Sequence, residues 1–178
     1  MLTDKYSAIC MNPPYMGSKH MDRVLKNYVR NNYPNTKSDL FAVFMDVASD
    51  RLANNAKYGM INMQSWMFLS AYEDLRVDVL SNYLIDSLLH LGPRTFDELA
   101  GEVVQNASFV ITKSSNVEYK YGYYVNLTEG CSSSNKESLF LASKINNQDF
   151  VYKDYPQDSF AKIPGNVIVY SFSKKVIS

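Results

Sequence analysis

The sequence is poor in cysteine and carries no excess of charge of either sign. Cys10 and Cys131 are the only two cysteines, and their separation fits neither a metal site nor a disulfide framework. Lys and Arg together number 18 and Asp and Glu together number 18, so the formal net charge is zero. A nucleic-acid partner would therefore have to meet a local basic patch, because no overall field attracts it.

Long apolar runs are also missing. No stretch reaches the roughly 18 residues of a membrane-spanning helix. The opening residues, MLTDKYSAIC, lack the charged region and the long apolar run of a signal peptide. Neither His20 nor His90 stands in a pattern that indicates a metal ligand or a catalytic base for a nucleophile. We therefore expect a protein of the reducing cytoplasm, with no metal and no membrane association.

What is present is an alternation of apolar runs and helical stripes over residues 1–113. Short apolar runs predict buried strands, and apolar residues at helical spacing predict helices. We expect strands at 6–11, 58–63, 84–91 and 103–112, and helices at 19–32, 38–54 and 69–83. Such alternation indicates an α/β fold, a mixed parallel sheet with helices on both faces. Ser38 is the expected N-cap of the second helix, with Asp39 in its first turn.

The composition changes after Lys113. The stretch YKYGYYVNL is rich in tyrosine and predicts an exposed or antiparallel strand. A short helix at 136–145 and a last strand at 167–172 are expected to follow. We therefore divide the chain into a domain at 1–113 and a β-rich extension at 114–178.

The most informative stretch is Asn12-Pro13-Pro14-Tyr15, which follows the first predicted strand directly. In a parallel α/β sheet, ligands bind where strands end and loops begin. Proline fixes φ and restricts the residue before it, so this loop is rigid. The Asn12 amide oxygen and the Pro13 carbonyl are two acceptors held beside the flat ring of Tyr15. This arrangement suits a planar ligand whose exocyclic amine donates both hydrogens while the ring stacks on it.

An apolar strand followed by NPPY resembles motif IV of the amino-group methyltransferases, chiefly the DNA adenine-N6 enzymes. Three later stretches are similar to the following helix, strand and last sheet strand of that family: KSDLFAVFMDVASDRL, KYGMINMQSWMF and GEVVQNASFVITK. Together with FAKIPGNVIVYSFS, they resemble most the large phage-defence methyltransferases of the BREX (PglX-like) type and single-chain restriction-modification enzymes. The resemblance covers residues 1–113 well and the remainder weakly.

The resemblance implies a chemistry for the loop. These enzymes rotate the target adenine out of double-stranded DNA into a pocket. Asn12 and Pro13 would then accept hydrogen bonds from the adenine N6, which attacks the methyl group of S-adenosylmethionine directly. Tyr15 would stack on the base and stabilise positive charge at N6. The implied catalytic residues are Asn12, Pro13, Pro14 and Tyr15.

Three further residues have two interpretations each. By resemblance, Phe109 is a second base-stacking aromatic; the alternative is a buried strand side chain. Asp39 and Phe41 lie where some relatives line the cofactor pocket, as Asn12 also does. The alternatives are a charge at the helix start for Asp39 and a core position for Phe41.

The family's glycine-rich turn and ribose-binding acid normally precede NPPY, which here begins at residue 12. We therefore expect the C-terminal half of a Rossmann-like class I methyltransferase sheet, followed by an extension that leads toward a target-recognition domain. Alone, such a fragment should bind S-adenosylmethionine poorly and show no turnover. Half a sheet also exposes strand 6–11, and an unpaired apolar edge favours a homodimer.

Four basic residues follow the loop, Lys19, Arg23, Lys26 and Arg30, at a spacing that places them on one helix face. This face could contact DNA phosphates; the alternative is an ordinary solvated surface.

Three functions remain open from the sequence. The first is a fragment of a DNA adenine-N6 methyltransferase from a restriction-modification or phage-defence system. The second is a protein-glutamine N5 methyltransferase, because a side-chain amide also presents an NH2 group to an NPPY motif. The third is a non-enzymatic DNA-binding or interaction module that keeps the scaffold.

Overall fold

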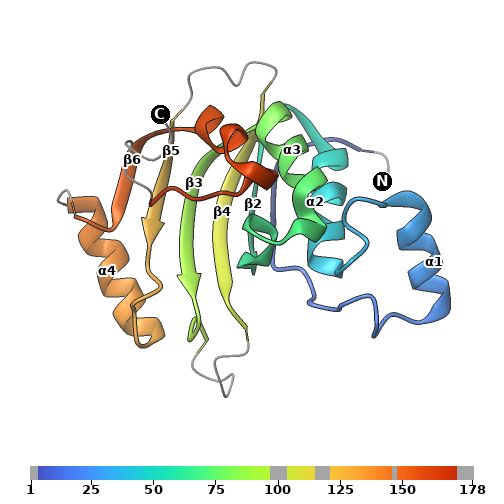
Figure 1. Ribbon diagram of the computed structural model, residues 1–178, viewed down its shortest axis with the longest axis horizontal. Coiled ribbons are helices and arrows are strands. Elements are labelled where there is room, and N and C mark those ends of the chain that lie inside the picture. Colours follow the sequence, from blue (N-terminus) through green and yellow to red (C-terminus); the bar gives the residue numbers. More distant parts are fainter. Residues whose placement is uncertain (1–3, 97–103, 115–120, 146–147, 172–178) are drawn as a thin grey trace.

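The computed structural model describes residues 4–96, 104–114, 121–145 and 148–171. Its centre is one six-stranded sheet with the order β1-β2-β4-β3-β5-β6 (Figure 1). The strands are β1 Tyr6–Met11, β2 Leu52–Met63, β3 Tyr83–Gly92, β4 Asn106–Lys113, β5 Tyr121–Asn126 and β6 Val151–Pro156. The α-helices are α1 Arg23–Asn32, α2 Leu40–Arg51, α3 Glu73–Asn82 and α4 Ser133–Ile145. Short 3-10 helices are η1 Gln64–Met67, η2 Ser70–Tyr72, η3 Gln157–Lys162 and η4 Pro164–Asn166. The α/β class predicted from the sequence is confirmed.

Strand directions bring several chain segments to one end of the sheet. β1 is parallel to β2, and β3 is parallel to β5. β4 lies antiparallel between β2 and β3, so these two strands point the same way. The carboxyl ends of β1, β2, β3 and β5 therefore meet where β4 begins. We call this end of the sheet the carboxyl rim.

Helix α2 differs from its prediction at both ends. The N-cap is Asp39, whose side chain accepts a hydrogen bond from the Phe41 N–H, and not Ser38. At the other end, β2 already begins at Leu52. Asn55 lies inside that strand with φ 60, a left-handed conformation that asparagine tolerates. The Asn54-Asn55 pair therefore belongs to the strand and not to the helix end.

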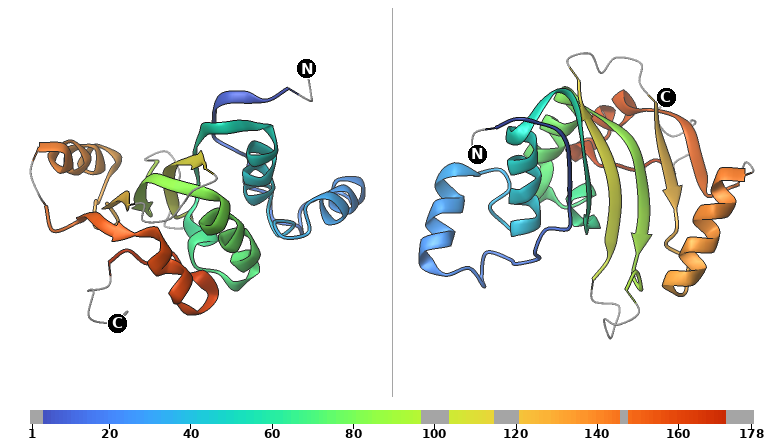
Figure 2. Two further views of the ribbon diagram at one scale, coloured as in Figure 1. Left: turned by 90° about the horizontal axis from the view of Figure 1, so that it is seen from above. Right: turned by 180° about the vertical axis from the view of Figure 1, so that it is seen from behind.

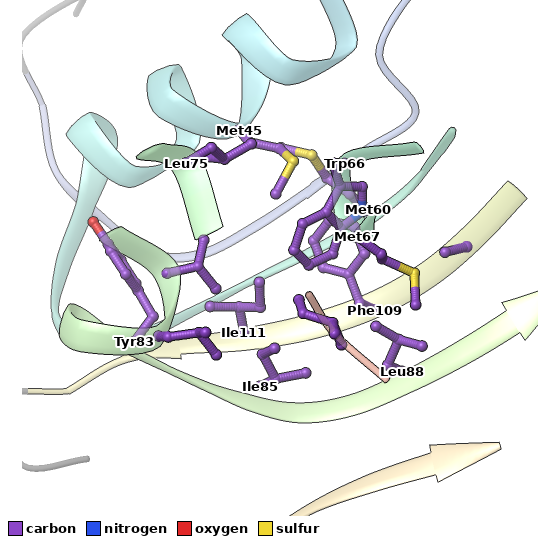
Figure 3. Packing of buried hydrophobic residues seen from close by; sticks show 14 of the residues in the cluster. Met45, Met60, Trp66, Met67, Leu75, Tyr83, Ile85, Leu88, Phe109 and Ile111 are labelled. Carbon is purple, nitrogen blue, oxygen red and sulfur yellow. The ribbon is translucent and has the colours of Figure 1, made fainter. Parts of the chain in front are cut away.

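One apolar core lies between the sheet and the helices α2 and α3. Figure 3 shows Met45 of α2 and Leu75 of α3 pointing toward Ile85, Phe109 and Ile111 of the sheet. All of these side chains are at most 3% exposed. Burial of such a cluster is the main force that fixes the helices on this face.

The predicted boundary at residue 113 is not a boundary in the structure. β5 pairs with β3, so the sheet continues across that position. Beyond β6 the chain crosses the same face as α3 (Figure 1), and Ile168 and Tyr170 join the core. The strand predicted at 167–172 does not form over its described residues, because Ile168 donates its N–H to the Met67 carbonyl (3.0 Å) outside the sheet.

Helix α4 lies on the opposite face of the sheet (Figure 2). Tyr124 of β5 points into the core, whereas its neighbour Tyr123 donates its hydroxyl hydrogen to the Ser143 carbonyl of α4 (2.9 Å). The prediction of helices on both faces is thereby confirmed. Across the described ranges, no helix has the length and apolar character needed to cross a bilayer.

Candidate active site

The NPPY loop leaves the sheet at the carboxyl rim. Met11, the last residue of β1, pairs with Met60 of β2, and the loop starts at the next residue. Asn12 is exposed, Pro13 is buried and Tyr15 is half-buried. Within the described part of the chain, the Asn12 amide has no hydrogen-bond partner. Its oxygen is therefore available to a ligand at the end of the strand.

Backbone hydrogen bonds fasten the far end of the loop to the start of α2. The Met16 N–H donates to Asp39 Oδ1 (2.9 Å), and the Leu40 N–H donates to the Met16 carbonyl (3.1 Å). A further bond joins the Ser18 N–H to the Ser38 carbonyl (2.9 Å). With prolines at one end and these bonds at the other, the loop has little conformational freedom.

Tyr15 is held at two points. Its ring meets Phe41 edge to face, with centroids 6.3 Å apart and planes at 85°. Its hydroxyl oxygen accepts a hydrogen bond from Asn106 Nδ2 at 2.8 Å. Burial raises the pKa of Tyr15, and the hydrogen bond from Asn106 is a smaller, opposite influence. Tyr15 is therefore a neutral phenol at physiological pH.

Sequence reasoning missed Asn106, the first residue of β4, which is 1% exposed. The available signal was an amide directly before the apolar run ASFVI, the position where a strand leaves the rim. Asn62 was missed as well. It lies near the end of β2, is 0% exposed, and neither of its amide atoms has a hydrogen-bond partner among the described residues.

A chain of polar side chains extends along the same rim. His90 Nε2 is hydrogen-bonded to Gln64 Oε1 (2.6 Å), and His90 Nδ1 to the Tyr170 hydroxyl (2.7 Å). Gln64 in turn donates its side-chain NH2 to Gln105 Oε1. Burial lowers the pKa of His90 to about 4, with a smaller contribution from the positive charge of Lys136. The imidazole is therefore neutral at physiological pH, donating from one nitrogen and accepting at the other.

The structure assigns other positions to three predicted site residues. Phe109 is 2% exposed, and its ring meets Tyr58 and Trp66 with centroids 6.1 and 5.1 Å away. A ring enclosed in this way belongs to the core and has no face free for a base. Phe41 is likewise a core residue at 1% exposed, and Asp39 is the helix cap described above. These positions agree with the structural alternative for Phe109 and Phe41, and the contact of Asp39 with the cofactor stays a prediction.

The predicted basic stripe is shorter than expected. Helix α1 begins at Arg23 with Asp22 as its N-cap, so Lys19 lies in the preceding turn and not on the helix. Arg23, Lys26 and Arg30 do lie at helical spacing, and both arginines are exposed. Tyr28 is 55% exposed on the same helix, but helical spacing places it on another side from Arg23 and Arg30. The basic surface thus consists of three helical residues.

The family model of the Eco57I restriction-modification methylases matches residues 1–96. The chain is 41% identical over 175 residues to the adenine-specific methyltransferase PglX of Lacticaseibacillus casei (strain Zhang), which covers 98% of this chain. It is 39% identical over 170 residues, 96% of this chain, to the adenine-specific methyltransferase BrxX of Escherichia coli O9:H4 (strain HS). The chain spans 14% of the length of each of these relatives.

The fold is similar to that of solved methyltransferase structures. The type I restriction-modification methyltransferase subunit of Streptococcus thermophilus superposes with a TM-score of 0.62 at 14% identity, over 92% of this chain and 37% of its own. This likeness confirms the predicted methyltransferase type of α/β sheet. The family model covers more than half of the chain, and it includes the NPPY loop. The chain therefore belongs to the Eco57I restriction-modification methylase family.

Proposed function

We propose that this chain carries the target-base part of the active site of an adenine-N6 DNA methyltransferase from a restriction-modification or phage-defence system. One observation carries the proposal: an unpartnered Asn12 amide projects from the end of β1, next to a tyrosine ring that is held at two points. The names of the two similar proteins, both adenine-specific methyltransferases, support adenine as the substrate. Neither a glutamine substrate nor a purely non-enzymatic role receives such support.

In this proposal the base amine is bound by two oxygens of the loop. The Asn12 side-chain oxygen and the Pro13 carbonyl each accept one hydrogen from the adenine N6, which turns the nitrogen lone pair toward the methyl donor. The Tyr15 ring lies against the base and stabilises the positive charge that develops at N6. As N6 gains the methyl group it releases one proton to solvent. Rigid placement of these groups is the main contribution of the chain to the rate.

S-adenosylmethionine supplies the methyl group when bound. Of the three residues predicted to contact it, Phe41 is buried in the core. Asp39 Oδ1 accepts two backbone N–H bonds, at 2.9 Å from Met16 and 3.3 Å from Phe41, whereas Asp39 Oδ2 has no hydrogen-bond partner among the described residues. The described residues therefore fit a contact to the cofactor at the Asn12 amide or at Asp39 Oδ2.

The test is methyl transfer by the full-length gene product that carries this chain. We expect Asn12→Ala to lower the transfer rate to adenine by about a hundredfold or more, because a preorganised hydrogen-bonding group is lost. Asn54→Ala, which removes an exposed asparagine near the start of β2 and away from the carboxyl rim, is the matched control and should match the unsubstituted protein. Absence of methylated adenine with the unsubstituted protein, or methylated glutamine instead, would refute the proposal.

Double-stranded DNA is the proposed partner, with Arg23, Lys26 and Arg30 of α1 at its phosphates. Replacing Arg23 and Arg30 with Glu should weaken DNA binding and flatten the plot of log affinity against log salt by about 2 units, one for each lost phosphate contact. Lys162→Glu is the control, since Lys162 is an exposed cation of η3, far from α1 in Figure 1. An unchanged salt dependence would make α1 an ordinary solvated helix.

We also propose the cytoplasm as the location and self-association through β1. Among the described strands, β1 pairs with β2 alone, and its residues are mostly exposed. An edge strand of this kind has one side open and can pair there with another copy. Sedimentation of the chain at high concentration should show dimers, and a purely monomeric profile would contradict this.

A further inference from the structure

The best-defined interaction at the carboxyl rim joins two residues 91 positions apart, Tyr15 and Asn106. Asn106 is 1% exposed and stands where β4 begins, paired with Met63 on one side and Gly92 on the other. Because both neighbouring strands fix its backbone, its amide occupies a set position. The same Nδ2 also lies 3.4 Å from the Asn62 carbonyl oxygen, which restricts the rotation of the amide group.

The residue before Asn106 is anchored as firmly. The Gln64 N–H donates to the Gln105 carbonyl at 2.9 Å, and the Gln64 side chain is bonded both to Gln105 and to His90. His90 is fixed by the Tyr170 hydroxyl. The start of β4 is therefore tied to β2, to β3 and to the C-terminal segment. A group attached to it holds its position better than one on a loop.

The effect on Tyr15 follows from what each contact controls. The edge contact with Phe41 limits the tilt of the ring. The bond from Asn106 to the hydroxyl oxygen fixes the far end of the ring, so the ring cannot swing about the Cα–Cβ bond. Since Asn106 is the donor, the phenolic hydrogen of Tyr15 points elsewhere. Without this bond, the ring would keep its stacking surface but lose its defined position.

We propose that Asn106 is a positioning residue, which holds the Tyr15 ring in place for stacking on the target base in the transition state. The proposal rests on the proposed function, because it is methyl transfer that needs this placement of the ring. It concerns orientation and not affinity. Loss of the bond should therefore lower the rate of the chemical step and leave DNA binding nearly unchanged.

The test is a double-mutant cycle in the full-length gene product, with Tyr15→Phe, Asn106→Leu and both changes together. Tyr15→Phe keeps the ring and removes the acceptor, and Asn106→Leu keeps the approximate shape and removes the donor. We expect each single change to slow single-turnover transfer about tenfold, and the double change also about tenfold, because both remove the same bond. DNA affinity should stay within about twofold of the unsubstituted protein.

Other outcomes are decisive in the opposite direction. A double variant that is slowed about a hundredfold would show that the two changes act independently, and this would overturn the positioning role. An unaltered rate for Asn106→Leu would overturn it as well. Asn82→Leu changes an exposed amide bonded only to Asp78, at the opposite end of the sheet, and is expected to leave the rate unaltered. If Asn106→Leu does not fold, Tyr15→Phe tests the same bond from the loop side, and an unchanged rate there overturns the role.

The experiment gives different results if the positioning role is wrong and if the proposed function is wrong. An unsubstituted protein that methylates no adenine refutes the function, and the positioning role with it. An active protein with independent effects at the two positions refutes the positioning role alone.

Discussion

Two buried side-chain amides lie at opposite ends of the sheet and differ in their hydrogen bonding. Gln157 of η3 is 1% exposed, and its amide makes three hydrogen bonds, with the Ile85 N–H (2.8 Å) and the carbonyls of Tyr83 (2.6 Å) and Leu80 (3.3 Å). Asn62, at the carboxyl rim, is 0% exposed, and neither of its amide atoms has a partner among the described residues.

The difference distinguishes a polar group whose hydrogen bonds are complete from one with hydrogen-bonding capacity unused. Buried polar groups in native proteins are nearly always hydrogen-bonded, and an exception calls for a specific reason. Gln157 joins the C-terminal segment to the start of β3, and its bonds are complete without a ligand. Asn62 lies in the strand that ends beside the NPPY loop, where unfilled hydrogen-bonding capacity can serve a ligand. Substitutions at the two ends should therefore affect different properties.

The largest loss of unfolding free energy is expected for a change at Arg76, which, like Gln157, makes its hydrogen bonds within the protein. This guanidinium is 0% exposed and makes four hydrogen bonds to the carbonyls of Trp66, Leu69 and Gly165. Arg76→Ala removes all four bonds and empties a fully buried position, and should cost about 4 kcal/mol of unfolding free energy. Thermal and urea unfolding measure it. Lys162→Ala breaks an exposed ion pair with Asp158 and should cost under about 0.5 kcal/mol; similar losses for both variants would contradict the prediction.

Gln157→Leu should cause the second-largest loss of unfolding free energy. The change keeps the approximate size of the side chain but leaves the Ile85 N–H and the Tyr83 carbonyl unpaired inside the protein. We expect a loss of about 2 kcal/mol in unfolding free energy, with the rate of methyl transfer by the remaining folded protein unaltered. A large fall in that rate at full folding would show that the two ends of the sheet are functionally coupled.

A pH-dependent change in stability of similar size is expected from the titration of His90. Burial lowers its pKa to about 4, whereas the unfolded chain has the ordinary value of about 6.5. Below that value the unfolded chain takes up a proton that the folded chain does not, so stability is lost as the pH falls from 6.5 toward 4. Between pH 7 and pH 5, the unsubstituted protein should therefore lose about 2 kcal/mol more unfolding free energy than the His90→Gln variant.

The opposite contribution of Asp46, whose pKa burial raises to about 6, is present in both proteins and cancels in this comparison. Equal pH dependence of the His90→Gln variant and the unsubstituted protein would show that His90 titrates normally.

The smallest change in stability is expected for Asn62→Leu. This variant gives the sharpest contrast with Gln157→Leu. Removing two unpartnered polar atoms by a side chain of similar shape should alter the unfolding free energy by less than about 1 kcal/mol, in either direction. If Asn62 serves the site, methyl transfer by the full-length gene product should fall while stability is kept. A loss as large as that of Gln157→Leu would mean that Asn62 is a structural amide.

Several features of this protein could be predicted because they depend on nearby residues. The first strand was predicted with its observed bounds, 6–11, since an apolar run followed by two prolines can hardly continue. The exposed position of Asn12 at its end follows from the same local chemistry. The helical stripes of α2 and α3 were predictable from their spacing, although their ends were not, because Asp39 competes with Ser38 as a cap.

The sequence by itself thus determined the α/β alternation and the rigid NPPY corner, because backbone restriction and hydrophobic periodicity act over a few residues. Only the tertiary structure decided which side chains complete the site. It paired Tyr15 with Asn106, enclosed Phe109 in the core and placed residues 121–126 beside β3. The physical reason is that a polar side chain bonds to whatever partner the folded chain brings within about 3 Å, and the local sequence contains no record of that partner.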